Sequence, residues 1–268
     1  MKKIIVLILM TLAFASCEDV VQIDLDTAPP RLVVEADIAW VKGTDGAVQQ
    51  IKLSSSTDFY ATDVPRILNA TVWIEDADAN RYDFILSDNL GTYQCTNFNP
   101  VVDGRYTLYI NHEDNLYTAT DKLYKTPEIQ EVEQEDEAGF TGEDIQLKFY
   151  FQDDAEQENS YVFKYNLLGK NYFKVADDEF FNGNQMYFLI LDEDIRTSDT
   201  IAVKLSGCST ANYNYLNKIL EVSSNSGNPF AAPIGVIRGN IINNTDPKNF
   251  PFGYFRLFQE EQLNYIVR

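Results

Sequence analysis

The chain has 268 residues, of which 41 are Asp or Glu and 21 are Lys or Arg, so its formal net charge is −20 at pH 7. A surface this acidic repels nucleic acid and anionic lipid headgroups, which argues against any function that depends on binding a phosphate backbone. A single histidine and three cysteines also argue against a zinc site built from these residues.

Residues 1–16 have the features of a secretory signal peptide. A basic start is followed by the apolar run 4–12 and by small residues. This run is too short to cross a bilayer as a helix, which needs roughly 20 apolar residues. Cys17 comes next, as in the lipobox of bacterial lipoproteins, although Phe14 stands where Leu is more usual. We expect Cys17 to become the mature N-terminus and to carry acyl chains such as palmitate. An ordinary signal peptide with a chance cysteine is the alternative.

Residues 17–30 are expected to form a lipidated tether. Thr27–Pro30 favours extended backbone and blocks a helix. Glu18 and Asp19 directly follow the cysteine, and acidic residues at this place resemble the surface-export signal of Bacteroidota lipoproteins. We therefore expect the protein on the cell surface, anchored to the outer membrane. The periplasmic face of that membrane is the alternative.

Residues 31–125 alternate apolar and polar side chains with a period of two, which is typical of half-buried strands. Turn-forming segments such as Gly43–Gly46 and Asp76–Asn80 separate these stretches. Short strands joined by turns at a spacing of roughly 8–12 residues predict a sandwich, here an Ig-like or transthyretin-like one. We expect its strands at 32–40, 48–53, 68–74, 82–86, 92–96, 106–110 and 116–120.

Residues 126–140 change composition and contain six Asp or Glu with few apolar residues. Mutual repulsion keeps such a segment extended and solvated, so we expect an acidic linker between two domains. The alternative is a charged edge strand, because Ile129 and Val132 offer side chains that can pack.

Residues 141–268 again show mostly strand patterns, with one interruption. Ser209 and Thr210 are suited to cap a helix near 211–222 that carries an apolar stripe. We expect this helix to cover an open end or edge of the second sheet. The predicted fold class is thus all-β: two consecutive β-sandwich domains, with one short helix in the second, after a lipoprotein signal peptide.

The sequence offers little for catalysis. His112 lies in a turn between two predicted strands, where nothing holds it against a partner, so we interpret it as a solvated turn residue. No P-loop and no dinucleotide-type glycine motif is present. We expect no enzymatic activity and assign no catalytic residue. A hydrolase that uses a pair of carboxylates stays as an alternative, because the chain contains 41 Asp and Glu, although no pair stands out among them.

We also expect no cofactor and no metal. The acidic clusters 153–154, 177–179 and 192–194 offer oxygen ligands for calcium. None has the alternating spacing of a dedicated calcium loop, so solvated turns are the preferred interpretation. Cys95 and Cys208 lie in different halves of the chain, and we expect two buried free thiols, with one disulfide as the alternative.

Aromatic residues gather between residues 172 and 188, in a region that is otherwise loop-like in composition. Rigid aromatics on a loop give a large contact area at low entropic cost, as at protein interfaces. We therefore predict a partner-binding surface, with a loop folded onto its own core as the alternative. The predicted contact residues are Tyr172, Phe173, Phe180, Phe181 and Asn182.

An ordered set of short phrases runs along the mature chain, and none of them is specific by itself. They are 32–36, 69–72, 91–93, 104–108, 178–183, 213–216, 228–230, 239–241 and 253–255. Taken together they resemble an uncharacterised family of Bacteroidota outer-membrane lipoproteins, defined by domain of unknown function 4249. Its members are often encoded beside SusC-like TonB-dependent receptors. The resemblance implies association with a large outer-membrane barrel and implies no reaction, because the family has no catalytic motif to transfer.

From these features we expect a non-enzymatic lipoprotein that binds an outer-membrane β-barrel protein, a SusC-like TonB-dependent transporter, and helps to capture its substrate. One alternative is a scaffold subunit of an outer-membrane assembly or secretion machine. A surface-anchored hydrolase is the other.

Overall fold

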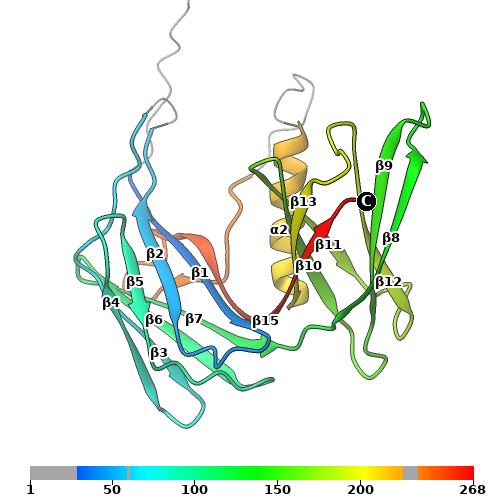
Figure 1. The fold of residues 1–268 in the computed structure, drawn as a ribbon. Helices are drawn as coiled ribbons and strands as arrows, with labels where there is room; N and C mark the ends of the chain where they lie inside the picture. Colours follow the sequence, from blue (N-terminus) through cyan, green and yellow to red (C-terminus); the bar gives the residue numbers. More distant parts are fainter. Residues whose placement is uncertain (1–28, 59–60, 226–234) are drawn as a thin grey trace, which may run out of the picture.

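The computed structural model describes residues 29–58, 61–225 and 235–268. Cys17 and most of the predicted tether lie outside the described residues, as does the phrase 228–230. Two lobes stand side by side, with the helix between them and one strand, β15, running through both (Figure 1). The elements are β1 (Leu32–Val41), β2 (Gln49–Ser55), β3 (Thr71–Asp76), β4 (Arg81–Leu86), β5 (Thr92–Cys95), β6 (Arg105–His112), β7 (Asn115–Tyr124), β8 (Ile129–Ala138), β9 (Asp144–Gln152), β10 (Ser160–Leu167), β11 (Lys170–Asp177), β12 (Gln185–Asp192), β13 (Thr200–Cys208), α2 (Thr210–Asn225), β14 (Ile242–Asn243) and β15 (Phe252–Ile266).

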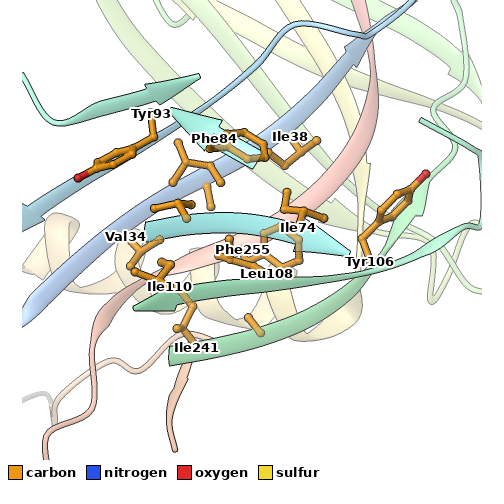
Figure 2. Close-up of a cluster of buried hydrophobic side chains, with 14 of the residues drawn as sticks. Val34, Ile38, Ile74, Phe84, Tyr93, Tyr106, Leu108, Ile110, Ile241 and Phe255 are labelled. Atoms are coloured by element: carbon orange, nitrogen blue, oxygen red, sulfur yellow. The ribbon is translucent and has the colours of Figure 1, made fainter. Parts of the chain in front are cut away.

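The first lobe, which we call the barrel lobe, is a closed sheet. Its strands follow the order β15-β1-β2-β5-β4-β3-β6-β7, and β7 pairs again with β15 through Leu123 and Tyr124. Alternate positions of the strands turn inward and form one core, part of which Figure 2 shows around Ile74, Leu108 and Phe255. Residues 31–125 are thus mostly β, as predicted, but they form a barrel-like sheet closed by β15 and not a separate sandwich. The alternation predicts which side chains face inward, but it does not reveal that a strand from the far end of the chain joins the two free edges.

His112 differs from its predicted role as a solvated turn residue. It is the last residue of β6, pairs with Asn115, and is buried with only 9% of its surface exposed. The turn itself consists of Glu113 and Asp114, both with positive φ, as the tight two-residue hairpin requires. Leu108, Ile110 and His112 occupy alternate inward positions of the strand, which explains the burial.

The second lobe, which we call the sandwich lobe, has two facing sheets. A three-stranded sheet, β12-β9-β8, faces the sheet made by β11, β10, β13 and the end of β15. Their shared core is aromatic: Phe163 stacks on Phe188 with ring centroids 4.9 Å apart, and Phe149 lies 5.3 Å from Phe163. Cys208 ends β13 and, like Cys95 in the barrel lobe, is a buried free thiol, as expected.

The predicted acidic linker is instead strand β8. It pairs with β9 from Ile129 to Ala138, with two irregularities in register. Ile129 and Val132 pack against the core, while Glu133 on the outer side accepts a hydrogen bond from Lys148 at 2.9 Å. The structure thus contains the charged edge strand that the sequence offered as the alternative, because a few inward apolar side chains suffice to hold an edge strand.

Strand β15 divides its length between the lobes. Residues 252–260 pair in parallel with β1, whereas residues 260–266 pair antiparallel with β13. Ile241, Phe255 and Leu257 belong to the barrel core, so this part of the predicted second domain, 141–268, lies in the first lobe. The two lobes are thus not consecutive segments of the sequence.

Helix α2 begins as predicted. The Ser209 side chain accepts a hydrogen bond from the Asn212 backbone N–H at 3.1 Å, which is the contact of an N-cap. The helix contacts β10 and β11 on the outer face of their sheet. Within the described ranges no helix is both long and apolar enough to cross a membrane.

Candidate functional site

A cleft of about 470 Å³ lies between the lobes. Strands β1, β2, β5 and β15 supply one wall with outward-facing residues of the barrel lobe, and β10, β11 and α2 supply the other. We call it the interlobe cleft. Its charged and polar lining residues include Glu35, Asp37, Lys52, Lys164, Asn212 and Arg256, and its apolar lining includes Val162, Phe173, Tyr215, Leu216 and Tyr254.

The cleft contains an ion-pair network that connects the two lobes. Arg256 donates from Nε and Nη2 to the two carboxylate oxygens of Asp37, at 2.8 and 2.7 Å. Asp37 also accepts a hydrogen bond from Lys164 Nζ at 2.9 Å. Since Asp37 lies on β1 and Lys164 on β10, one carboxylate binds cations of both lobes.

The Asp37 carboxylate is ionised over the whole physiological range. Burial by itself raises its pKa, but the charges and hydrogen bonds of Arg256 and Lys164 outweigh burial and hold the pKa well below its ordinary value. Solvent still reaches the side chain through the cleft, because 44% of its surface is exposed. Arg256, in contrast, is only 3% exposed and lies with its guanidinium carbon 4.3 Å from the centre of the Phe258 ring.

Two lining residues have buried polar atoms without a partner in the part of the chain that the structure describes. They are Asn212, whose Oδ1 and Nδ2 are both unpaired, and Arg256, whose Nη1 is unpaired. Asn212 is fully buried in the first turn of α2. Each unpaired buried atom costs about 1–3 kcal/mol of folding free energy. A molecule bound in the cleft that hydrogen-bonds to these atoms would recover part of this cost.

Aromatic rings form the apolar part of the lining. Tyr215 of α2 packs on Tyr254 of β15 with centroids 4.9 Å apart, which fixes the helix over the barrel wall. Burial, with a smaller effect of the neighbouring Asp121, raises the pKa of Tyr254 to about 12, so the ring stays neutral. A cleft with a few placed polar groups and aromatic walls is the usual form of a small-molecule site.

The structure does not bring the five predicted contact residues onto one surface. Tyr172 and Phe173 lie on strand β11, where Tyr172 stacks on Tyr165 at 5.1 Å and Phe173 lines the interlobe cleft. Phe180, Phe181 and Asn182 lie in the turn between β11 and β12. Phe180 and Phe181 are 80% and 54% exposed. The expected loop is therefore only residues 178–184, because β11 and β12 occupy the flanking residues.

This turn is held by carboxylates from the acidic clusters. Asp153 accepts a hydrogen bond from the Gly183 N–H at 2.8 Å, and Asp178 accepts one from the Asn159 N–H at 2.8 Å. Both side chains are buried. Nowhere in the described ranges do three or more His, Cys, Asp or Glu side chains gather as a metal site would require. Asp153 and Asp178 thus accept hydrogen bonds within turns, but they are buried and not solvated as expected.

Sequence reasoning found Phe173 but not the charged part of the cleft. Asp37 and Arg256 are charged residues in largely apolar strands, and that is the signal that marks them. Their pairing depends on the parallel register of β1 and β15, which joins residues 219 positions apart.

A family model described as "Domain of unknown function (DUF4249)" matches residues 18–264. No curated protein matches the chain.

Several solved structures share features with the chain at low similarity. A cytokine receptor complex is 8% identical, with 68% of this chain and 85% of that chain covered and a TM-score of 0.27. A two-domain fibronectin type-III segment of chicken tenascin is 8% identical, with 59% and 83% covered and a TM-score of 0.20. The FN1–FN3 domains of chicken CNTN1 are 11% identical, with 67% and 59% covered and a TM-score of 0.22.

Proposed function

The chain belongs to the family of the domain of unknown function DUF4249, and from this premise we propose that it is a lipid-anchored binding protein of the bacterial outer membrane. In this role it serves a β-barrel transporter of the SusC-like, TonB-dependent type as a non-enzymatic accessory subunit. It holds a small solute in the interlobe cleft, and it contacts the transporter through the exposed turn between β11 and β12.

The interlobe cleft is the observation that carries this proposal. It is formed in the chain itself and combines charged groups, buried unpaired polar atoms and aromatic rings. Such a combination favours the binding of a solute with fixed orientation.

Anchorage and the transporter rest on the sequence. Acyl chains on Cys17 would keep the lobes at a membrane surface, since two lipid chains give lasting attachment. The partner class comes from the family resemblance described above. Phe180 and Phe181 support a contact surface, because exposed aromatic side chains contribute strongly to protein interfaces.

The anchor is tested by Cys17→Ala in the native host. We expect the variant to move from the membrane fraction to the soluble fraction and to lose the mass of its acyl chains in mass spectrometry. A variant that stays in the membrane fraction contradicts the anchor.

The partner surface is tested by purifying the tagged full chain in mild detergent and identifying the barrel that accompanies it. We expect Phe180→Ser combined with Phe181→Ser to abolish capture while the melting temperature stays unchanged, because both side chains are exposed. Phe140→Ser is the matched control, since Phe140 is fully exposed in the turn after β8. Equal capture by all three forms contradicts this surface.

A further inference from the structure

We propose that the interlobe cleft binds a small organic acid, a molecule with one carboxylate attached to a ring or another apolar body. This inference rests on the proposed binding role and adds the class of solute. Three properties of the lining point to it: the sign of its charge, its unpaired polar atoms and the chemistry of its walls.

The cleft is positive within a strongly negative molecule. Its lining holds three cations, Lys52, Lys164 and Arg256, against two carboxylates, Glu35 and Asp37. The whole chain has a net charge of −20. An acidic solute that is repelled by the general surface is therefore attracted to the cations of this lining. A surplus of a single charge suits a monoanion better than a polyphosphate.

The existing ion pairs leave cationic donors available. Asp37 forms ion pairs with both Arg256 and Lys164. Lys164 donates only one of its hydrogen bonds to Asp37, so it retains donors for a second anion. Lys52 makes no ion pair within the described ranges. The pKa of Asp88 is lowered mainly by a backbone hydrogen bond from Thr92, and the charge of Lys52 adds a small contribution. Charge-assisted hydrogen bonds from two lysines would fix a carboxylate firmly.

Unpaired buried atoms lie beside the same surface. The Asn212 side chain offers one donor and one acceptor that no described residue uses, and Arg256 Nη1 offers another donor. A bound acid group, directly or through water, can complete these hydrogen bonds. No comparable gain is available to an apolar solute.

The aromatic lining of the cleft favours a ligand whose remaining part is apolar. Phe173, Tyr215 and Tyr254 present aromatic surface beside the charged lining residues. A volume of about 470 Å³ accommodates a molecule of one or two rings. A ring body with one carboxylate satisfies both the rings and the lysines.

Binding to the full chain in detergent micelles is the test. Two acids, benzoate and galacturonate, are each compared with a neutral counterpart, benzamide and galactose, by calorimetry or by NMR titration. We expect at least one acid to bind at least about tenfold more tightly than its neutral counterpart, because a charge-assisted hydrogen bond is lost in the neutral molecule. Binding of the acid should weaken as salt is added.

Variants locate the site. Lys52→Gln and Lys164→Gln should each weaken acid binding about tenfold. Lys170→Gln is the matched control, since Lys170 is exposed at the turn between β10 and β11 and does not line the cleft. Lys52 has no structural bond to lose, so a loss of binding in Lys52→Gln is separate from any loss of folding. Bound acid should also protect Lys52 from reductive methylation, as measured by mass spectrometry.

Several outcomes overturn the proposal. They are equal binding of acid and neutral molecule, binding of the neutral molecules alone, no binding of either acid, or equal behaviour of Lys52→Gln and Lys170→Gln. Neutral binding alone would leave the general binding role standing. Capture of a transporter depends on Phe180 and Phe181 and is measured by the purification experiment. Failure of the acid-binding test is therefore distinguishable from failure of the capture test.

Discussion

At the residue scale, two glycines allow β15 to enter the barrel lobe. Gly253 has a φ of +97°, and a side chain there would overlap the backbone oxygen of Val34 on β1. A side chain on Gly239 would overlap the backbone oxygen of Gly253 itself. Three backbone segments thus approach more closely than any other residue type permits.

Gly253→Ala should therefore destabilise the protein by more than about 3 kcal/mol, since steric overlap adds to the torsional cost. Gly169→Ala separates the two effects, because Gly169 also has a positive φ but nothing within 4 Å of an added Cβ. It should cost only about 1–2 kcal/mol. Urea unfolding of both variants measures the difference, and equal losses would mean that the close approach does not matter.

Two carboxylates near Arg256 respond to pH in opposite directions. Asp37 has a lowered pKa, so its contribution to stability is complete above the ordinary value and is lost only at strongly acidic pH. Burial raises the pKa of Asp121 to about 6, although Arg256 and Lys122 oppose this rise. Protonated Asp121 is therefore favoured in the folded state, and stability from this group is lost as pH rises from about 4 through about 6.

Asp121→Asn should remove this loss. The variant should match the wild type near pH 4 and exceed its free energy of unfolding by on the order of 2 kcal/mol at pH 8. Asp83→Asn is the control, since Asp83 is an exposed carboxylate paired with Arg81 and its replacement should change stability by less than about 1 kcal/mol. A difference that does not change with pH would show that Asp121 is not titrating in this range.

At the scale of elements, periodicity predicts much of the fold. The alternating stretches of 31–125 correspond closely to strands, and the helix appears where Ser209 was expected to cap it. Periodicity failed at β8, because its outward positions carry acids and its register is irregular, so the alternation that marks a strand is broken. Of the five predicted contact residues only Phe173 lines the cleft. The sequence pattern does not show which face of a strand borders the cleft, nor that Asp37 pairs with Arg256 across 219 residues, because both depend on how distant strands pair.

The identity of β8 as a packed strand can be tested by side-chain removal. Val132→Ser should cost about 1 kcal/mol, because Val132 is half-buried against the sandwich core. Gln130→Ser changes an exposed residue of the same strand and should cost almost nothing. Thermal unfolding measures both. A solvated linker would tolerate the two changes equally.

At the scale of the whole molecule, the shared strand should make the two lobes unfold together. Residues 252–258 contribute to the barrel core, and residues 260–266 pair with β13 in the sandwich lobe. The Asp37–Arg256–Lys164 network adds a second connection. A calorimetric scan should show one transition whose calorimetric and van't Hoff enthalpies agree.

Substitutions in either core should shift that same transition. Ile74→Ala in the barrel lobe and Phe149→Ala in the sandwich lobe each remove a fully buried side chain and should cost about 2–5 kcal/mol. Two separate transitions, each responding to only one of these substitutions, would contradict the coupling.

Strand β15 also determines when the protein can finish folding. It is the last strand in the chain, yet it lies between β1 and β7. During synthesis, which proceeds from the amino end, the barrel lobe remains open with two unpaired edges until β15 is made, and such edges favour pairing with other chains. A premature stop codon near residue 250 would therefore prevent folding of the barrel lobe, which is synthesised first, as well as of the sandwich lobe. Cellular quality control would then degrade an entire polypeptide that lacked only its final segment.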